Sequence, residues 1–109
     1  MRYKVTIENA VQQLAREKKQ RFTTLIQHGS LSVEYYAPRQ IDPQQPHLQD
    51  ELYVITSGTG IFFRDGERVT FKPGDVLFVP AGMEHRFENF TDDFAAWVIF
   101  YGPEGGEKE

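Results

Sequence analysis

The spacing of hydrophobic residues changes from helical to strand-like about twenty residues into the chain. Between Glu8 and about Lys18, apolar residues recur at helical intervals and predict an amphipathic helix. The apolar positions of this helix are Ala10, Val11, Leu14 and Ala15. Before it, Tyr3, Val5 and Ile7 alternate with polar residues, as in a half-buried strand. Residues 1 to 7 are therefore expected to form a strand.

After residue 20, short β-rich runs alternate with glycine and proline turn signals. Eight strands are expected, at residues 21–27, 31–36, 51–55, 61–64, 68–71, 76–79, 85–88 and 94–101. Asp65-Gly66 lies between the fourth and fifth runs and is a hairpin turn signal. The polar segment 39–50 is expected to be a loop. This rhythm favours an all-β sandwich or barrel over alternating βαβ units.

The length of 109 residues predicts a single domain over residues 1–109, with a barrel core at about 21–101. The glycine-rich segment 102–109 is expected to be a flexible tail. A barrel this small buries limited surface, yet 14% of its residues are aromatic. Part of that ring area is expected at an interface, so we predict a homodimer formed through the N-terminal region and one barrel face.

Charge and composition exclude several classes of partner. The net charge is −4 and no predicted strand face carries a basic cluster, which argues against nucleic acid. No run is long and apolar enough for a membrane span, and no secretory signal begins the chain, so a cytoplasmic location is expected. Cysteine is absent, so a metal ion would need nitrogen and oxygen ligands.

Candidate metal ligands lie in two segments. In an extended chain Gln45 and His47 share a face, and Glu51 follows four residues later. His85 begins a predicted strand after the Pro80-Ala81-Gly82 turn. If that strand lies beside the Glu51 strand, two imidazoles and a carboxylate converge, a ligand set suited to Fe, Mn, Ni or Zn. Asp50 is expected to point away from this site and to stay solvated.

These segments resemble the two motifs of the cupin superfamily. The second motif is matched at every defined position, by Gly74, Pro80, Gly82, His85 and Asn89. In the first motif His47, Glu51 and Gly58 are present, but Gln45 replaces the first histidine of a His-x-His pair. The resemblance covers about residues 31–101. It implies a small double-stranded β-helix (jelly-roll) barrel that holds one divalent metal ion, with Gln45 or a water completing the ligand set.

Two functions follow from this resemblance. The first is a metal-dependent enzyme of isomerase, lyase or dioxygenase type, in which the metal acts as a Lewis acid on a small polar organic substrate. The second is a non-catalytic module that binds or senses a small ligand. An enzyme also needs an acid or base near the metal. Tyr53 is the first candidate for that role, and Tyr35 or Tyr36 are the others.

Overall fold

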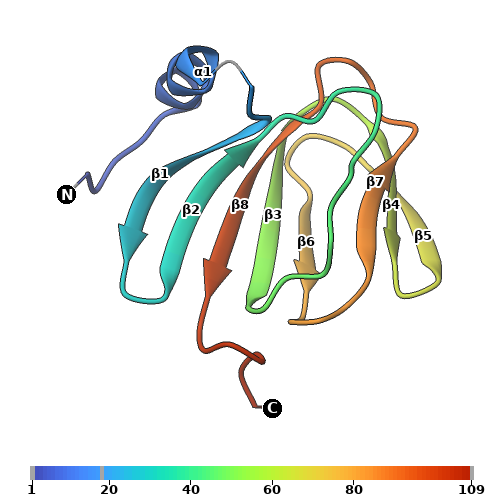
Figure 1. Ribbon diagram of the computed structural model, residues 1–109. Helices are drawn as coiled ribbons and strands as arrows, with labels where there is room; N and C mark the ends of the chain where they lie inside the picture. Colours follow the sequence, from blue (N-terminus) through green and yellow to red (C-terminus); the bar gives the residue numbers. More distant parts are fainter. Residues whose placement is uncertain (1, 18, 109) are drawn as a thin grey trace.

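The computed structural model describes residues 2–17 and 19–108, which form one helix and eight strands (Figure 1). The helix α1 spans Ile7–Arg16. The strands are β1 (Phe22–His28), β2 (Leu31–Tyr36), β3 (Asp50–Ser57), β4 (Gly60–Arg64), β5 (Glu67–Phe71), β6 (Val76–Val79), β7 (His85–Glu88) and β8 (Ala95–Tyr101). The expected all-β class and its eight strands are confirmed, with every strand end within about two residues of its predicted position.

The strands form two antiparallel sheets. The larger has the order β1-β2-β8-β3-β6 and the smaller the order β5-β4-β7. Strand β7 pairs with β4, where His85 lies opposite Arg64, and it is not a neighbour of β3. The His85 strand therefore does not lie beside the Glu51 strand, which was the arrangement under which the two side chains were expected to converge. His85 and Glu51 meet across the barrel interior instead.

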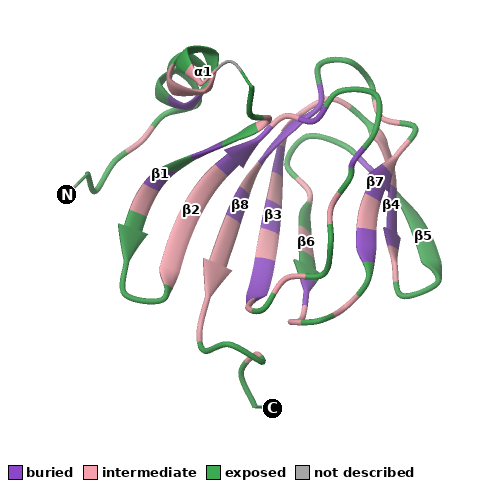
Figure 2. Cartoon of the chain, in the orientation of Figure 1, coloured by how far each residue is buried: buried purple, intermediate pink, exposed green. Residues whose placement is uncertain are grey.

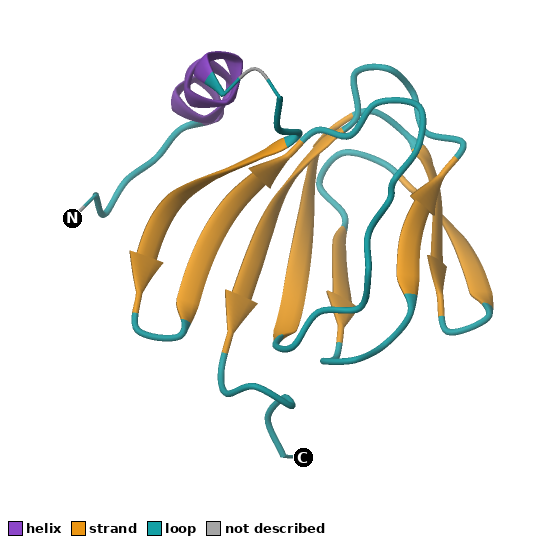
Figure 3. Cartoon of the chain, in the orientation of Figure 1, coloured by secondary structure: helices purple, strands orange, loops and turns teal. Residues whose placement is uncertain are grey.

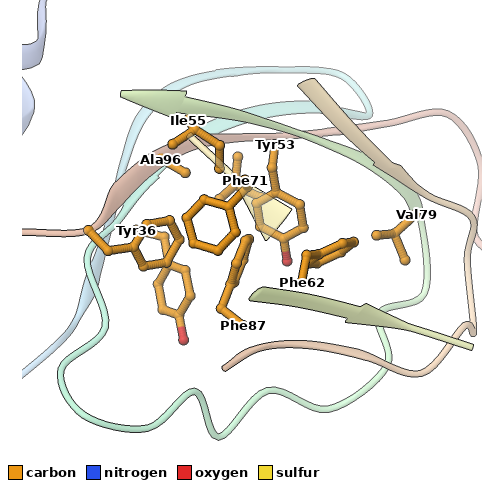
Figure 4. Packing of buried hydrophobic residues seen from close by; sticks show 10 residues of the cluster. Tyr36, Tyr53, Ile55, Phe62, Phe71, Val79, Phe87 and Ala96 are labelled. Atoms are coloured by element: carbon orange, nitrogen blue, oxygen red, sulfur yellow. The ribbon is translucent and has the colours of Figure 1, made fainter. Parts of the chain in front are cut away.

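An aromatic core fills the space between the sheets (Figure 4). Phe87 lies at its centre, with ring centroids 4.6 Å from Phe94 and 4.9 Å from Tyr53. Such tilted and edge-on pairs are favourable arrangements for aromatic rings. The burial colours place this core on the inner faces of β3, β4 and β7, whereas most of β5 is exposed (Figure 2). One end of the aromatic core borders the site described below.

The helix α1 begins with a capping box and packs at the β1 side of the molecule (Figure 3). The hydroxyl of Thr6 accepts a hydrogen bond from the backbone of Asn9, whose side chain accepts one from the backbone of Thr6. Ala10 is fully buried against the sheet, and Gln13 donates to the hydroxyl of Thr23. The expected strand over residues 1–7 is wrong for the described part, because residues 2–6 are not strand and Ile7 begins the helix.

The segment 102–109, expected to be a flexible tail, forms hydrogen bonds to the barrel in its described part, which excludes residue 109. The backbone of Gly105 donates to the carbonyl of Leu48, and that of Glu107 donates to the carboxylate of Asp50. These hydrogen bonds fix the segment against the start of β3, where the site begins.

In the described part of the chain, the ten-residue α1 is too short to cross a membrane.

Candidate metal centre

His85 enters the barrel interior at the first position of β7. The turn before it requires a positive φ at Gly82 (79°), whose N–H donates to the carbonyl of His47 over 2.8 Å. This hydrogen bond joins the two motif segments directly. The His85 side chain is buried, and its Nδ1 lies 2.9 Å from the carbonyl oxygen of Met83. Since a carbonyl can only accept, Nδ1 carries the proton, and the lone pair of Nε2 faces the interior in the neutral ring.

Glu51 supplies a fully buried carboxylate on the inner face of β3. Its exposure is 0%, and neither oxygen has a hydrogen-bond partner among the described residues. Oε1 lies 2.8 Å from His85 Nε2, so with a neutral imidazole two lone pairs face each other. Burial lowers the pKa of His85, but the nearby Glu51 and the Met83 carbonyl outweigh that effect and raise it. A buried carboxylate without a donor is costly, and either a proton or a metal ion between these atoms would remove the cost.

His47 completes the cluster from the loop before β3. Its Nε2 is 3.9 Å from Glu51 Oε1, and its ring packs edge-on against Phe100 with centroids 5.0 Å apart. Burial lowers the pKa of His47, while the charge of Glu51 opposes that shift. The neutral imidazole is the form that binds metal. Ligand atoms of His47, Glu51 and His85 lie within 4.8 Å of one another, so these residues fit a divalent ion.

The structure separates the two neighbouring glutamines. Gln45 is exposed, whereas the Oε1 atom of Gln44 lies 3.0 Å from His47 Nε2 and accepts a 2.8 Å hydrogen bond from the Tyr53 hydroxyl. Ligation by Gln45 stays a prediction, and the amide beside the cluster is that of Gln44. Residues 37–49 form an irregular loop, in which alternate residues need not share a face as they do in a strand.

Asp42 orients Gln44 and was not anticipated from the sequence. Its carboxylate accepts hydrogen bonds from the Gln44 amide (2.7 Å), from the backbone N–H of Phe87 (2.8 Å) and from the Tyr36 hydroxyl. Burial, together with this contact to Asp42, raises the pKa of Tyr36. An aspartate in a polar loop gives no sequence signal for such a role, since its partners come from distant strands.

Tyr53 lies at the cluster, as expected for a residue two positions from Glu51. Its hydroxyl is 3.0 Å from His85 Nε2, and the residue is fully buried. Burial and then the charge of Glu51 raise the pKa of Tyr53 well above its ordinary value, so the phenol keeps its proton and acts as a donor. Tyr35 instead faces α1 and contacts Trp97, with ring centroids 5.2 Å apart.

Asp50 points away from the cluster. The expectation that its carboxylate stays solvated is wrong, because the residue is buried. It is 5% exposed and accepts hydrogen bonds from the backbone N–H groups of Ala81 and Glu107. These two donors hold the pKa of Asp50 below its ordinary value. Asp50 thereby ties β3 to the turn before His85 and to the C-terminal segment.

A cavity of about 540 Å³ adjoins the cluster. Gln44 and His47 line one part of it, and Val98 and Phe100 provide apolar wall. Glu34 and Tyr36 also contribute to the lining, and Lys19 lies among its charged residues. The cavity has the size and mixed lining of a small-molecule site.

Comparison with known proteins identifies the family. Residues 32–101 match the family described as Cupin domain. An uncharacterised protein of Streptomyces coelicolor is 33% identical over 85 residues, which cover 76% of this chain and 81% of that protein. The chain therefore belongs to the cupin family.

Other relatives match over part of their length. A gentisate 1,2-dioxygenase of a Streptomyces species is 31% identical over 62% of this chain and 19% of that enzyme. The transcriptional activator RhaS of Mannheimia succiniciproducens is 35% identical over 55% of this chain and 22% of the activator. The chain thus spans about a fifth of the length of either protein.

Solved structures share the fold. A protein from Ralstonia eutropha that has been suggested to be a mannose-6-phosphate isomerase is 26% identical, with a TM-score of 0.64 over 72% of this chain and 81% of that one. A cupin 2 conserved barrel protein from Salinispora arenicola has a TM-score of 0.63 at 23% identity, covering 74% of each chain. The expected cupin barrel is confirmed.

Proposed function

We propose that the protein binds one divalent metal ion through His47, Glu51 and His85, and that it is an enzyme acting on a small organic molecule in the adjoining cavity. The observation that carries the proposal is the Glu51 carboxylate, which is fully buried without a hydrogen-bond donor while two imidazoles lie close to it. A cation at this position would compensate the buried charge. Zn, Fe, Mn and Ni all accept this set of nitrogen and oxygen ligands.

The residues around the cluster suit Lewis-acid chemistry. When bound, the metal would polarise an oxygen of the substrate and stabilise negative charge that develops there. Tyr53 holds its proton beside the cluster and donates it in a hydrogen bond to Gln44, so it is not placed to act as a base. Asp42 and Gln44 fix the orientation of this hydroxyl. Val98 and Phe100 provide an apolar wall against which water is less favourable.

The relatives support an enzyme and also leave a second function open. The similarity to a gentisate 1,2-dioxygenase and to a suggested mannose-6-phosphate isomerase favours chemistry at a metal. The similarity to the activator RhaS favours a module that binds a small ligand without converting it. Fold alone does not decide between them. A cytoplasmic location also stays a prediction.

Metal loading tests the site. Apo-protein is incubated with Zn, Fe, Mn and Ni salts, and bound metal is measured by elemental analysis after desalting. We expect about one ion per chain in the wild type and loss of most of it in a variant that combines His47→Ala and His85→Ala, since two of three strong ligands are gone. His28→Ala is the matched control, because His28 is exposed on β1. Equal metal in the wild type and the double variant would refute the ligand assignment.

Turnover separates the two functions. Metal-loaded protein is incubated with gentisate and, separately, with mannose 6-phosphate, and each compound is followed by NMR. Conversion that stops in the variant lacking His47 and His85 supports an enzyme. Saturable shifts of protein resonances without conversion would favour a binding module.

A further inference from the structure

Glu34 places a second inward-facing carboxylate on the cavity wall. It lies on β2, opposite Val98 of β8. Residues two apart on a strand share a face, and Tyr36, two positions further on, belongs to the barrel core. Glu34 therefore points into the barrel, and it lines the same cavity as His47. Glu34 is not one of the proposed metal ligands.

The carboxylate of Glu34 is poorly paired. It accepts a long hydrogen bond of 3.4 Å from the Ser32 hydroxyl, and no ion pair among the described residues reaches it. Burial raises the pKa of Glu34, and the charge of Glu51 adds to this effect, while hydrogen bonds from the Ser32 and Thr24 hydroxyls oppose it. A half-buried carboxylate of this kind gains free energy from any donor that enters the cavity.

The cavity is lined by polar groups from several segments and by the apolar side chains of Val98 and Phe100. Gln44 and His47 line it beside the metal cluster, Glu34 lines it from β2, and Lys19 and Arg21 also belong to the lining. Tyr53 pairs with Val98, which pairs with Glu34, so Glu34 and Tyr53 are two strands apart. That separation is about 10 Å between backbones, a span that a ligand of a few carbon atoms can bridge within the cavity.

We propose that the cavity binds a small organic ligand that has an oxygen donor group at the metal cluster, a short apolar body, and a hydroxyl or ammonium group that donates to Glu34. Glu34 is then a specificity-determining residue, because it discriminates ligands by the donor at their far end. The inference rests on the proposed function, since the metal holds the first end of the ligand.

A set of matched probes tests this proposal. Butyrate, 4-hydroxybutyrate and 4-aminobutyrate share a carboxylate and differ only in the group at the other end. Each is titrated into metal-loaded protein by NMR, using the wild type, Glu34→Leu and Glu67→Leu. Leucine has a similar size without polar atoms, and its burial in an apolar wall should preserve the fold. Glu67 is exposed on β5 and provides the matched control.

We expect at least one of the two substituted acids to bind the wild type and the Glu67 variant about ten-fold more tightly than butyrate. In the Glu34 variant this preference should disappear while metal content stays unchanged. Equal affinity of the wild type for all three probes, including no binding of any, would overturn the inference. So would a preference that survives Glu34→Leu. Failure of the proposed function would appear earlier and separately, as a wild type that binds no metal.

Discussion

At the scale of single residues, Gln44 and Gln45 offer two amides of identical chemistry at different positions. The oxygen of Gln44 is 3.0 Å from His47 Nε2, while the side chain of Gln45 is exposed. Asp42 and Tyr53 each form a hydrogen bond with the Gln44 amide and hold it in place. An amide oxygen fixed in this way can either bind the metal directly or orient His47, and both roles strengthen metal binding.

We therefore expect Gln44→Ala to weaken metal affinity about ten-fold and Gln45→Ala to leave it nearly unchanged. Competition titration with a chelating dye measures both variants under the same conditions. Since the two substitutions remove the same atoms one residue apart, each serves as the control for the other. A larger loss in the Gln45 variant would support Gln45 as the ligand.

Residues with fixed spacing could be predicted from the sequence, and residues positioned by tertiary contacts could not. His47, Glu51 and His85 stand at motif intervals, and the structure brings them together. Gln44 faces the cluster only because its loop is irregular and Asp42 anchors its amide. Glu34 faces the cavity because of the way β2 pairs with β8, and one sequence does not specify that pairing.

At the scale of elements, Gly58 illustrates why the first motif ends in glycine. It follows β3 with a φ of 81°, and a Cβ atom there would lie 2.5 Å from the Cα of Phe94. Phe94 is part of the aromatic core, so the backbone approaches closely at a point that cannot move without disturbing the packing. The end of β3 and the start of β8 depend on this contact.

Replacing Gly58 by alanine should reduce the free energy of unfolding by about 3 kcal/mol, since the left-handed backbone and the clash both add cost. Gly29→Ala is the control, because Gly29 has a φ of 58° but no atom within 4 Å of the added Cβ. There the cost should be about 1 kcal/mol, from backbone strain alone. Urea denaturation of the two variants gives the comparison. Equal losses would mean that the contact with Phe94 relaxes freely.

Strand positions could be read from the sequence because turn residues bound nearly every run. Asp65 and Gly66 both adopt positive φ between β4 and β5, as a two-residue hairpin requires. The strand expected over residues 1–7 does not form in the described part of that segment, and there is a physical reason. Among the described residues no strand pairs with this alternating segment, and the capping box of Thr6 and Asn9 begins a helix instead.

At the scale of the whole molecule, α1 has a second apolar surface. Ala10 is fully buried against the sheet, but Ile7 and Val11, one turn apart, are 46% and 51% exposed. Tyr3, just before the helix, is 94% exposed. Close by, the edge strand β1 leaves one row of backbone groups without a neighbour in its sheet. These features lie on the N-terminal region that was expected to meet a second copy.

We therefore predict a homodimer in which an exposed apolar surface, formed by Ile7 and Val11 of α1 and by Tyr3 before it, contacts the partner. Burying these side chains removes apolar area from water, which is the main source of stability in subunit interfaces. Light scattering should give twice the chain mass of 12.6 kDa for the wild type. Replacing Ile7 and Val11 by glutamine should yield monomers, since glutamine keeps helix propensity while opposing burial. Leu48→Gln, which changes an exposed leucine (68%) away from the helix, is the control and should remain dimeric. A wild type that is monomeric at micromolar concentration would refute the dimer, whereas a dimer that survives both helix substitutions would refute only this interface.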